Sequence, residues 1–279
     1  MDTAIPIPTI DLFPGIDGLL IDVLQSLEPA DWQKQTLSPA WKVKDVAAHL
    51  LDGNIRSLST SRDRFFAEDA IRTDHFREVV DYINLLNMDW VKAMKRVSPD
   101  MLIALLSVTN KMYSDHLREL PPFDTAIFPV AWAGEAESQN WFHIAREYTE
   151  KWHHQQQIRH AVGVLSPLFD RTYFKPYVDT SLRALPYHLN RVKAEEGDTF
   201  SLIVSGHGGG EWHYMYTPEG WAVCQEPPSY SVTKVRIDDQ VIWRLFSNQI
   251  SREELHDRTL VTGRKELADV FFGMTAVMV

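Results

Sequence analysis

Apolar residues recur at helical spacing in five segments that precede Pro167. Several ends of these segments carry helix punctuation: Ser98 and Pro99 form a capped start, Pro121 follows an end, and Gly163 stands near the last end. Amphipathic helices joined by short connections favour an antiparallel bundle. The five segments are residues 15–29, 37–66, 75–96, 98–120 and 137–164.

Beyond Pro167 the pattern changes to a mixture of helical spacing and period-2 alternation. One helical segment at residues 171–189 precedes residues 198–227, which predict three short strands joined by turns. We therefore expect two domains: an all-α four-helix-bundle domain over residues 1–164 and an α+β domain over residues 165–279. The remaining predicted elements are strands at residues 230–238 and 259–263 and helices at residues 238–249, 251–257 and 264–279.

Composition narrows the class of protein. The 279 residues are 44% hydrophobic and 24% charged, as in an ordinary globular protein, and the net charge is −10. This charge opposes binding to nucleic acid or to an anionic membrane, and we find neither an apolar span long enough for a bilayer nor a secretion signal. The single cysteine, Cys224, excludes an intramolecular disulfide. We expect a cytoplasmic monomer or homodimer.

Three side chains form a candidate metal site. Glu150 and His154 stand one helical turn apart in the last bundle segment, with Cα atoms about 6 Å apart along the axis, so that one ion can bind both. His49 lies in the second segment and supplies a third ligand if the two helices pack together. Three protein ligands leave a coordination position open for water or substrate, which is typical of a catalytic metal site.

Simpler interpretations of these residues stay open at this stage. Glu150 with His154, like Glu147 with Lys151, is also an ordinary surface pair that contributes only about 0.2–0.5 kcal/mol to a helix. His49, flanked by alanine and leucine, also suits a core histidine that bonds a backbone carbonyl. Spacing alone does not decide between these interpretations.

Other residues that could take part in binding or catalysis give weaker indications of a functional site. His153 points about 100° away from His154 and suits a supporting or surface position, and His160 lies off the proposed ligand face. Residues Gly208–Gly210 lack the lysine and the strand-to-helix context of a phosphate loop, so they predict a hairpin turn. Cys224 has strand neighbours that favour a packed structural cysteine.

Two motifs carry a resemblance to a known family. "LSPAWKVKDVAAHL" at residues 37–50 resembles the start of the maleylpyruvate isomerase amino-terminal domain, a member of the DinB-like metal-binding bundles. "REYTEKWHH" at residues 146–154, followed by "QQQIR", is similar to that family's second metal segment. The strand-rich tail, including "LIVSGHGGGEWHYMY" at residues 202–216, is similar to the sterol-carrier-protein-like domain of mycothiol-dependent maleylpyruvate isomerases.

The resemblance implies a ligand set and cofactors. Carried over by position, the family's metal ligands fall on His49, Glu150 and His154. The metal is a divalent ion, usually zinc, and the cofactor is a low-molecular-weight thiol such as mycothiol. Many members carry an aspartate where this chain has Gln157, which leaves the substrate and the thiol open. The family's catalytic arginine has no motif here; the candidates are Arg56, Arg77 and Arg146.

We therefore expect a metal- and thiol-dependent isomerase or S-transferase that acts on a small electrophilic substrate. The metal would lower the pKa of the bound thiol and so generate the nucleophile. The alternative is a non-catalytic metal- or apolar-ligand-binding protein, suggested by aromatic residues in the tail, although core packing also explains them. These aromatic residues are Trp212, Tyr214, Tyr216, Trp221 and Trp243.

Overall fold

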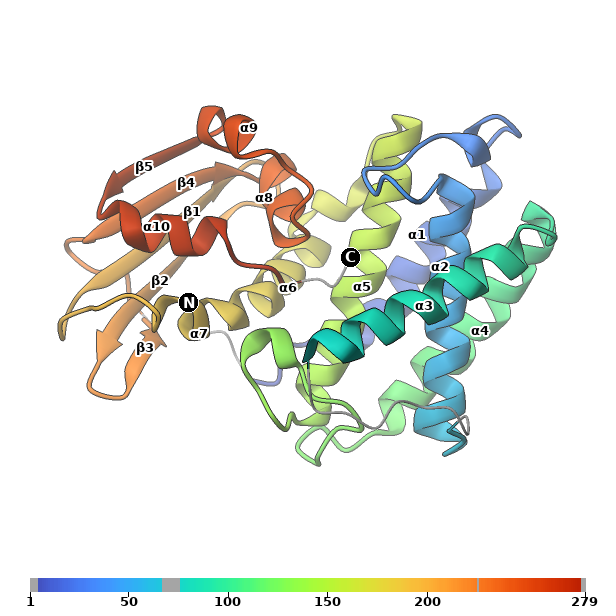
Figure 1. Ribbon diagram of the computed structural model, residues 1–279, viewed down its shortest axis with the longest axis horizontal. Coiled ribbons are helices and arrows are strands. Elements are labelled where there is room, and N and C mark those ends of the chain that lie inside the picture. Colours follow the sequence, from blue (N-terminus) through green and yellow to red (C-terminus); the bar gives the residue numbers. More distant parts are fainter. Residues whose placement is uncertain (1–4, 67–75, 225, 277–279) are drawn as a thin grey trace. The chain divides into compact units, whose positions relative to one another are not determined.

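Five long helices form the amino-terminal part of the chain (Figure 1). The computed structural model describes residues 5–66, 76–224 and 226–276, without the side chains of Phe76 and Arg77. The Ser98 side chain accepts a hydrogen bond from the Met101 backbone N–H, as the predicted cap requires. The helices are α1 (Phe13–Gln25), α2 (Val43–Ser57), α3 (Phe76–Met94), α4 (Pro99–Glu119) and α5 (Asn140–Val162).

Contacts group the chain into two compact units. The helical unit contains Ile10–Ile127 and Glu150–Ser166, and the sheet unit contains the residues up to Thr9, Phe128–Thr149 and the residues from Pro167 onward. Helix α5 therefore contributes to both units. The domain division that we expected after residue 164 stays a prediction.

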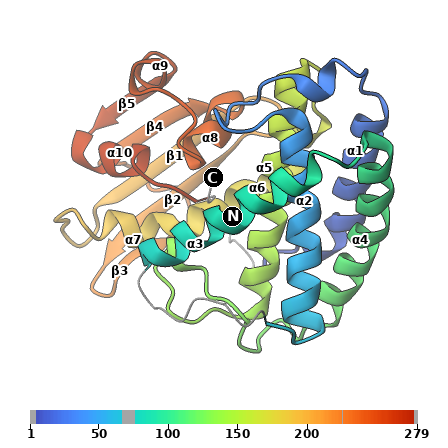
Figure 2. The ribbon, with the colours of Figure 1, turned by 45° about the vertical axis from the view of Figure 1, so that its right-hand side comes forward.

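In the helical unit, α2 packs against α3 and α4, and α1 packs against α4 (Figure 2). The Trp90 indole of α3 donates a hydrogen bond to the Ala48 carbonyl of α2 at 2.9 Å, which ties these two helices together. The apolar stripes of the helices meet in one core, as the helical spacing predicts. Fully buried members of this core include Val43, Val46, Ala47, Leu51, Leu102, Leu106 and Ile158.

The sheet unit contains a five-stranded sheet in the order β3-β2-β1-β4-β5. Strand β1 pairs in parallel with β4, whereas the other neighbouring pairs are antiparallel. The described fold is thus a helical region followed by an α+β region, which confirms the predicted fold class. The strands are β1 (Thr199–Ser205), β2 (Gly210–Thr217), β3 (Gly220–Val223), β4 (Thr233–Asp238) and β5 (Thr259–Gly263).

Helices cover one face of this sheet. Trp212 of β2 donates a hydrogen bond to Asp179 of α6 (Arg171–Ser181) at 2.7 Å, and Trp243 of α8 (Asp239–Phe246) is fully buried. Helices α7 (Leu185–Leu189) and α10 (Lys265–Phe272) also contact the sheet. Trp212, Tyr214 and Trp221 are buried too, so core packing accounts for most of the tail's aromatic residues.

Several predicted element boundaries are wrong. The segment at residues 171–189 is not one helix: a 3₁₀ turn at Leu182–Ala184 separates α6 from α7, and Pro186 lies in the first turn of α7. Helix α10 ends at Phe272, because the chain turns at Gly273. Residues 251–257 do contain a helix, α9 (Arg252–Asp257), capped by Ser251 as predicted.

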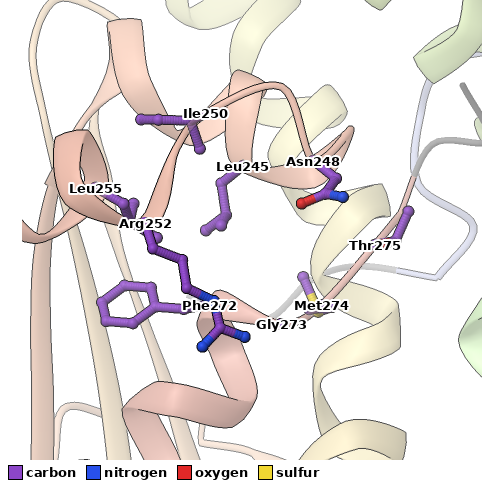
Figure 3. A pocket seen from close by; sticks show the side chains of 9 residues that line it. All are labelled: Leu245, Asn248, Ile250, Arg252, Leu255, Phe272, Gly273, Met274 and Thr275. Carbon is purple, nitrogen blue, oxygen red and sulfur yellow. The ribbon is translucent and has the colours of Figure 1, made fainter.

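A cavity of about 210 Å³ lies in the sheet unit (Figure 3). Leu245, Phe272 and Met274 supply apolar walls, and the polar groups of Asn248 and Arg252 line it as well. None of the predicted metal ligands lines this cavity.

Among the described residues, no helix is both long and apolar enough to cross a membrane.

Candidate metal centre

His49 is positioned by the way α2 begins and packs. The Asp45 carboxylate accepts a hydrogen bond from the Lys42 backbone N–H at 3.0 Å, which caps the first turn. Val46 and Leu50 are buried on the core side of the helix. His49 lies beside this apolar stripe: the residue as a whole is half-buried, and the Nδ1 atom of its ring is buried. The apolar spacing of α2 therefore places the imidazole at the edge of the core.

Glu150 and His154 lie one turn apart on α5, as predicted. The Glu150 Oε2 atom is 3.4 Å from His154 Nε2. The His154 side chain is only 1% exposed, and Glu150 is half-buried. The pair is therefore not an ordinary surface pair.

The structure brings His49, Glu150 and His154 together. One ligand atom from each residue lies within 4.8 Å of the other two. The two imidazole rings meet edge to face, with centroids 4.6 Å apart. Ligand atoms on a tetrahedral ion at about 2.0–2.2 Å stand roughly 3.4 Å apart, so small side-chain rotations would bring all three atoms to bonding distance.

Hydrogen bonding orients the His154 ring. Its Nδ1 atom lies 2.8 Å from the Oε1 atom of Gln157, and because this amide oxygen can only accept, Nδ1–H donates the hydrogen bond. The Nε2 lone pair then faces the Glu150 carboxylate, and two facing acceptors repel unless a cation or proton lies between them. His154 Nε2 and His49 Nδ1 are buried without a hydrogen-bond partner among the described residues. This donor set fits a divalent ion such as zinc.

Electrostatics keep the His49 imidazole neutral. Burial lowers the pKa of His49 well below its ordinary value of 6.5, and the neighbouring His154 and Arg56 lower it further. A neutral imidazole is the form that binds a metal. His49 Nδ1 makes no hydrogen bond to a backbone carbonyl among the described residues, so this nitrogen gives no support to the alternative of a carbonyl-bonded core histidine.

Trp41 packs against both histidines. Its ring centroid lies 4.7 Å from that of His49 and 6.1 Å from that of His154. The Trp41 carbonyl accepts hydrogen bonds from Thr36 Oγ1 at 2.7 Å and from Gln35 Nε2 at 2.8 Å. The loop before α2 thus fixes an indole beside the candidate site, which gives the site an apolar wall.

The three candidate arginines have different surroundings. Arg56, on α2, lies 3.4 Å from Asp52 Oδ2 and donates a hydrogen bond to Asn87 Oδ1 at 3.3 Å. Arg146 pairs with Glu147. The side chain of Arg77 lies outside the described part of the chain. The charge of Arg56 acts on a predicted ligand, because it helps to lower the pKa of His49.

Some neighbours of the site differ from the sequence-based interpretation. Lys151 does not pair with Glu147 on the surface; it is buried, and its Nζ lies 2.6 Å from Asp17 Oδ1. His153 is fully buried, so a surface position is wrong, whereas His160 is exposed.

Comparison with known proteins places the chain in a family. The sequence model described as the mycothiol maleylpyruvate isomerase N-terminal domain matches residues 16–159, just over half of the chain. The chain belongs to this family. The matched residues include all three predicted ligands. No curated protein matches the chain.

Two solved structures share the fold of this mycothiol maleylpyruvate isomerase family member. A mycothiol-dependent maleylpyruvate isomerase variant, with one histidine replaced by alanine, has a TM-score of 0.54 at 12% identity, covering 93% of each chain. A structure of mycothiol-dependent maleylpyruvate isomerase has a TM-score of 0.52 at 12% identity, covering 89% of this chain and 91% of that chain. At this identity the likeness shows the fold.

Two residues that contact the predicted ligands, Gln157 and Trp41, were not predicted from the sequence. Gln157 was noted only as a departure from the family, although its i,i+3 spacing from His154 puts both on one helix face. Trp41 lies in the loop before α2, where no periodicity relates it to His49, so its packing could not be inferred.

Proposed function

We propose that this chain is a metal-dependent, low-molecular-weight-thiol-dependent isomerase or S-transferase that acts on a small electrophile. One observation carries the proposal: ligand atoms of His49, Glu150 and His154 lie within 4.8 Å of one another, with unsatisfied buried nitrogens among them. Membership of the mycothiol maleylpyruvate isomerase N-terminal domain family supports mycothiol as the thiol.

In this proposal His49, Glu150 and His154 would hold the ion. When bound, the ion lowers the pKa of a coordinated thiol, so that the thiolate forms near neutral pH. The Gln157 amide oxygen accepts a hydrogen bond from His154 Nδ1–H and thereby keeps the Nε2 lone pair directed towards Glu150. The Trp41 indole excludes water from one side of the two imidazoles.

The overall chemistry is addition or displacement at an electrophilic carbon. Thiolate addition to an activated double bond, rotation and elimination convert a cis isomer into the trans isomer and return the thiol. Maleylpyruvate is the first substrate to test, because the related structures carry that name.

We propose the cytoplasm as the location of the protein. Cys224 is half-buried and forms no disulfide, which is compatible with a reducing compartment.

The test is an activity assay with controlled metal content. Protein stripped with a chelator is assayed with mycothiol and maleylpyruvate, before and after one equivalent of zinc is added. We expect activity only with both zinc and thiol, and its loss in His49→Ala and His154→Ala. The matched control is His160→Ala, because His160 is an exposed histidine on the same helix. Full activity in the stripped protein without thiol would reject the proposal.

A further inference from the structure

Helix α4 carries apolar side chains on two opposite faces. One face, which includes Leu102 and Leu106, is buried in the core of the helical unit. On the other face, Met101 is 53% exposed, Val108 is 60% exposed and Met112 is 38% exposed. A helix on the surface of a bundle ordinarily has polar residues on its outer face. The core of the helical unit therefore explains only one of the two apolar faces of α4.

The exposed face has the spacing of a coiled-coil seam. Its four apolar residues lie at positions i, i+4, i+7 and i+11, and they are Met101, Leu105, Val108 and Met112. These alternating steps of four and three residues bring the side chains onto one stripe, the α4 stripe, which is roughly 17 Å long. Single exposed apolar residues need no explanation, whereas a contiguous apolar stripe indicates a contact surface.

The order of residues in the α4 stripe fits a second copy of the same stripe. We consider two antiparallel α4 helices related by a two-fold axis at the middle of the stripe. Met101 then faces the partner's Met112, and Leu105 faces the partner's Val108. A two-fold interface requires such self-complementarity, because both subunits use the same patch.

The amino-terminal end of the α4 stripe is basic. Lys95 and Arg96 are exposed in the turn that precedes α4, and neither side chain forms an ion pair within the described residues. Asp100, in the first turn of α4, offsets one of these two charges. Two basic residues against one acidic residue leave this end with a net charge of +1.

The carboxyl-terminal end of the stripe is acidic by the same count. Lys111 pairs with Asp115 at 2.6 Å, so their charges cancel. The charge of Arg118 is likewise cancelled by Asp11 at 2.5 Å. Glu119 is exposed and has no ion-pair partner among the described residues, which leaves this end with a net charge of −1. An antiparallel arrangement brings the acidic end of each copy to the basic end of the other, and helix dipoles favour the same arrangement.

We propose that the α4 stripe is a dimer interface, which binds the α4 stripe of a second copy of this chain with the two helices antiparallel. One pair of helices buries less than about 1,200 Å², the size of weak and transient complexes, so the dimer should dissociate at micromolar concentrations. None of the predicted metal ligands lies on α4, so this inference does not depend on the proposed function.

Sedimentation equilibrium of the full-length protein at increasing concentrations tests the interface. We expect the average mass to rise from one chain towards two chains across the micromolar range. Val108→Glu places two carboxylates beside the two-fold axis and should raise the dissociation constant by at least about tenfold. The control is Leu165→Glu, because Leu165 is a 94% exposed leucine outside α4, and this variant should dimerise as the wild type does. Circular dichroism should give the same helix content for both variants.

Charge reversal tests the antiparallel orientation. The double variant Lys95→Glu/Arg96→Glu makes both ends of the stripe acidic, and Glu119→Lys makes both ends basic. Each variant alone should therefore dimerise more weakly than the wild type, because like charges meet at both ends of the interface. In an equimolar mixture of the two, opposite charges meet at both ends, so a mixed dimer should form with about the wild-type affinity.

Two results would overturn the interface. The first is a wild-type protein that stays monomeric throughout the micromolar range, and the second is a dimer that Val108→Glu weakens no more than Leu165→Glu does. A mixture of the charge variants that dimerises no more strongly than either variant alone would overturn the antiparallel orientation.

Discussion

Two polar clusters in the helical unit include neighbouring residues of α5, and they differ in whether a positively charged side chain lies among their acceptor atoms. In the first, Lys151 donates hydrogen bonds to Asp17 Oδ1 at 2.6 Å and to Asn110 Oδ1 at 2.8 Å, and Asn54 also donates to Asn110. In the second, His49, Glu150 and His154 direct acceptor atoms towards one another, and the described residues supply no cation among them. The first cluster carries its own cation.

The comparison teaches how to tell a structural polar cluster from a binding one. Acceptors that converge on a protein ammonium are compensated once the chain folds, so the Lys151 cluster acts on stability. Acceptors that converge on one another repel until a cation arrives, so the His49 cluster acts on binding. The following experiments separate the two roles.

Breaking the Lys151 cluster should have the largest effect on folding. Asp17→Ala leaves a buried, unpaired ammonium and should lower the free energy of unfolding by about 3–5 kcal/mol. Urea denaturation monitored by circular dichroism measures this loss. The double variant Asp17→Leu/Lys151→Met should recover most of it. A loss below about 1 kcal/mol in Asp17→Ala would remove the structural role of the cluster.

Zinc should stabilise the protein through the second cluster. At a free zinc concentration 100 times the Kd, binding adds about 2.7 kcal/mol to the free energy of unfolding. Thermal and urea unfolding of stripped and zinc-loaded protein measure the increment. It should vanish in His154→Ala and persist in His160→Ala, which changes an exposed histidine. An equal increment in both variants would place the zinc elsewhere.

The same two clusters show which parts of the candidate site could be predicted from the sequence and which could not. The positions of Glu150 and His154 follow from helical periodicity, and the apolar stripe of α2 places His49 at the edge of the core. The Lys151–Asp17 pair could not be predicted, because its partners lie 134 positions apart and neither residue type is commonly buried. Local spacing suggested Glu147 for Lys151, whereas the structure pairs Lys151 with Asp17 of α1.

The fold likewise could be predicted only in part from the sequence. Periodicity predicted the long helices and the strands, because their apolar faces are regular. It did not predict the break between α6 and α7, where the spacing continues through a 3₁₀ turn, or the early end of α10 at Phe272. The parallel pairing of β1 with β4 depends on a crossover, and strand patterns alone do not specify the partner.

Gln157 should tune the affinity of the second cluster for zinc. Gln157→Leu removes the acceptor for His154 Nδ1 and should weaken zinc binding by about 10- to 100-fold. Competition with a chromophoric chelator measures the Kd. Gln156→Leu is the control, because the Gln156 amide accepts a hydrogen bond from Ser166 and touches no predicted ligand. Equal affinities of the two variants would mean that Gln157 does not orient His154.

The pH dependence of stability tests the burial of two histidines, His49 and His153. Burial lowers the pKa of His49 and of His153 well below 6.5, so the unfolded chain binds more protons below that pH. Stability of metal-free protein should be complete above pH 6.5 and fall as the pH decreases below it, by up to about 1.4 kcal/mol per pH unit for each histidine.

Urea denaturation at pH 7.5, 6.5 and 5.5 measures this dependence. His153→Gln should reduce the slope, whereas His256→Gln, at a side chain that is 91% exposed, should not. A stability that stays constant across these pH values would contradict the burial of the two histidines.

The location of a bound ion tests the central claim most directly. Crystals of zinc-loaded protein, with diffraction data collected on both sides of the zinc absorption edge, give the position of the ion from its anomalous signal. We predict one peak per chain, at about 2.0–2.2 Å from a ring nitrogen of His49, a ring nitrogen of His154 and a carboxylate oxygen of Glu150. A peak bound by other residues, or none at stoichiometric zinc, would contradict the metal centre.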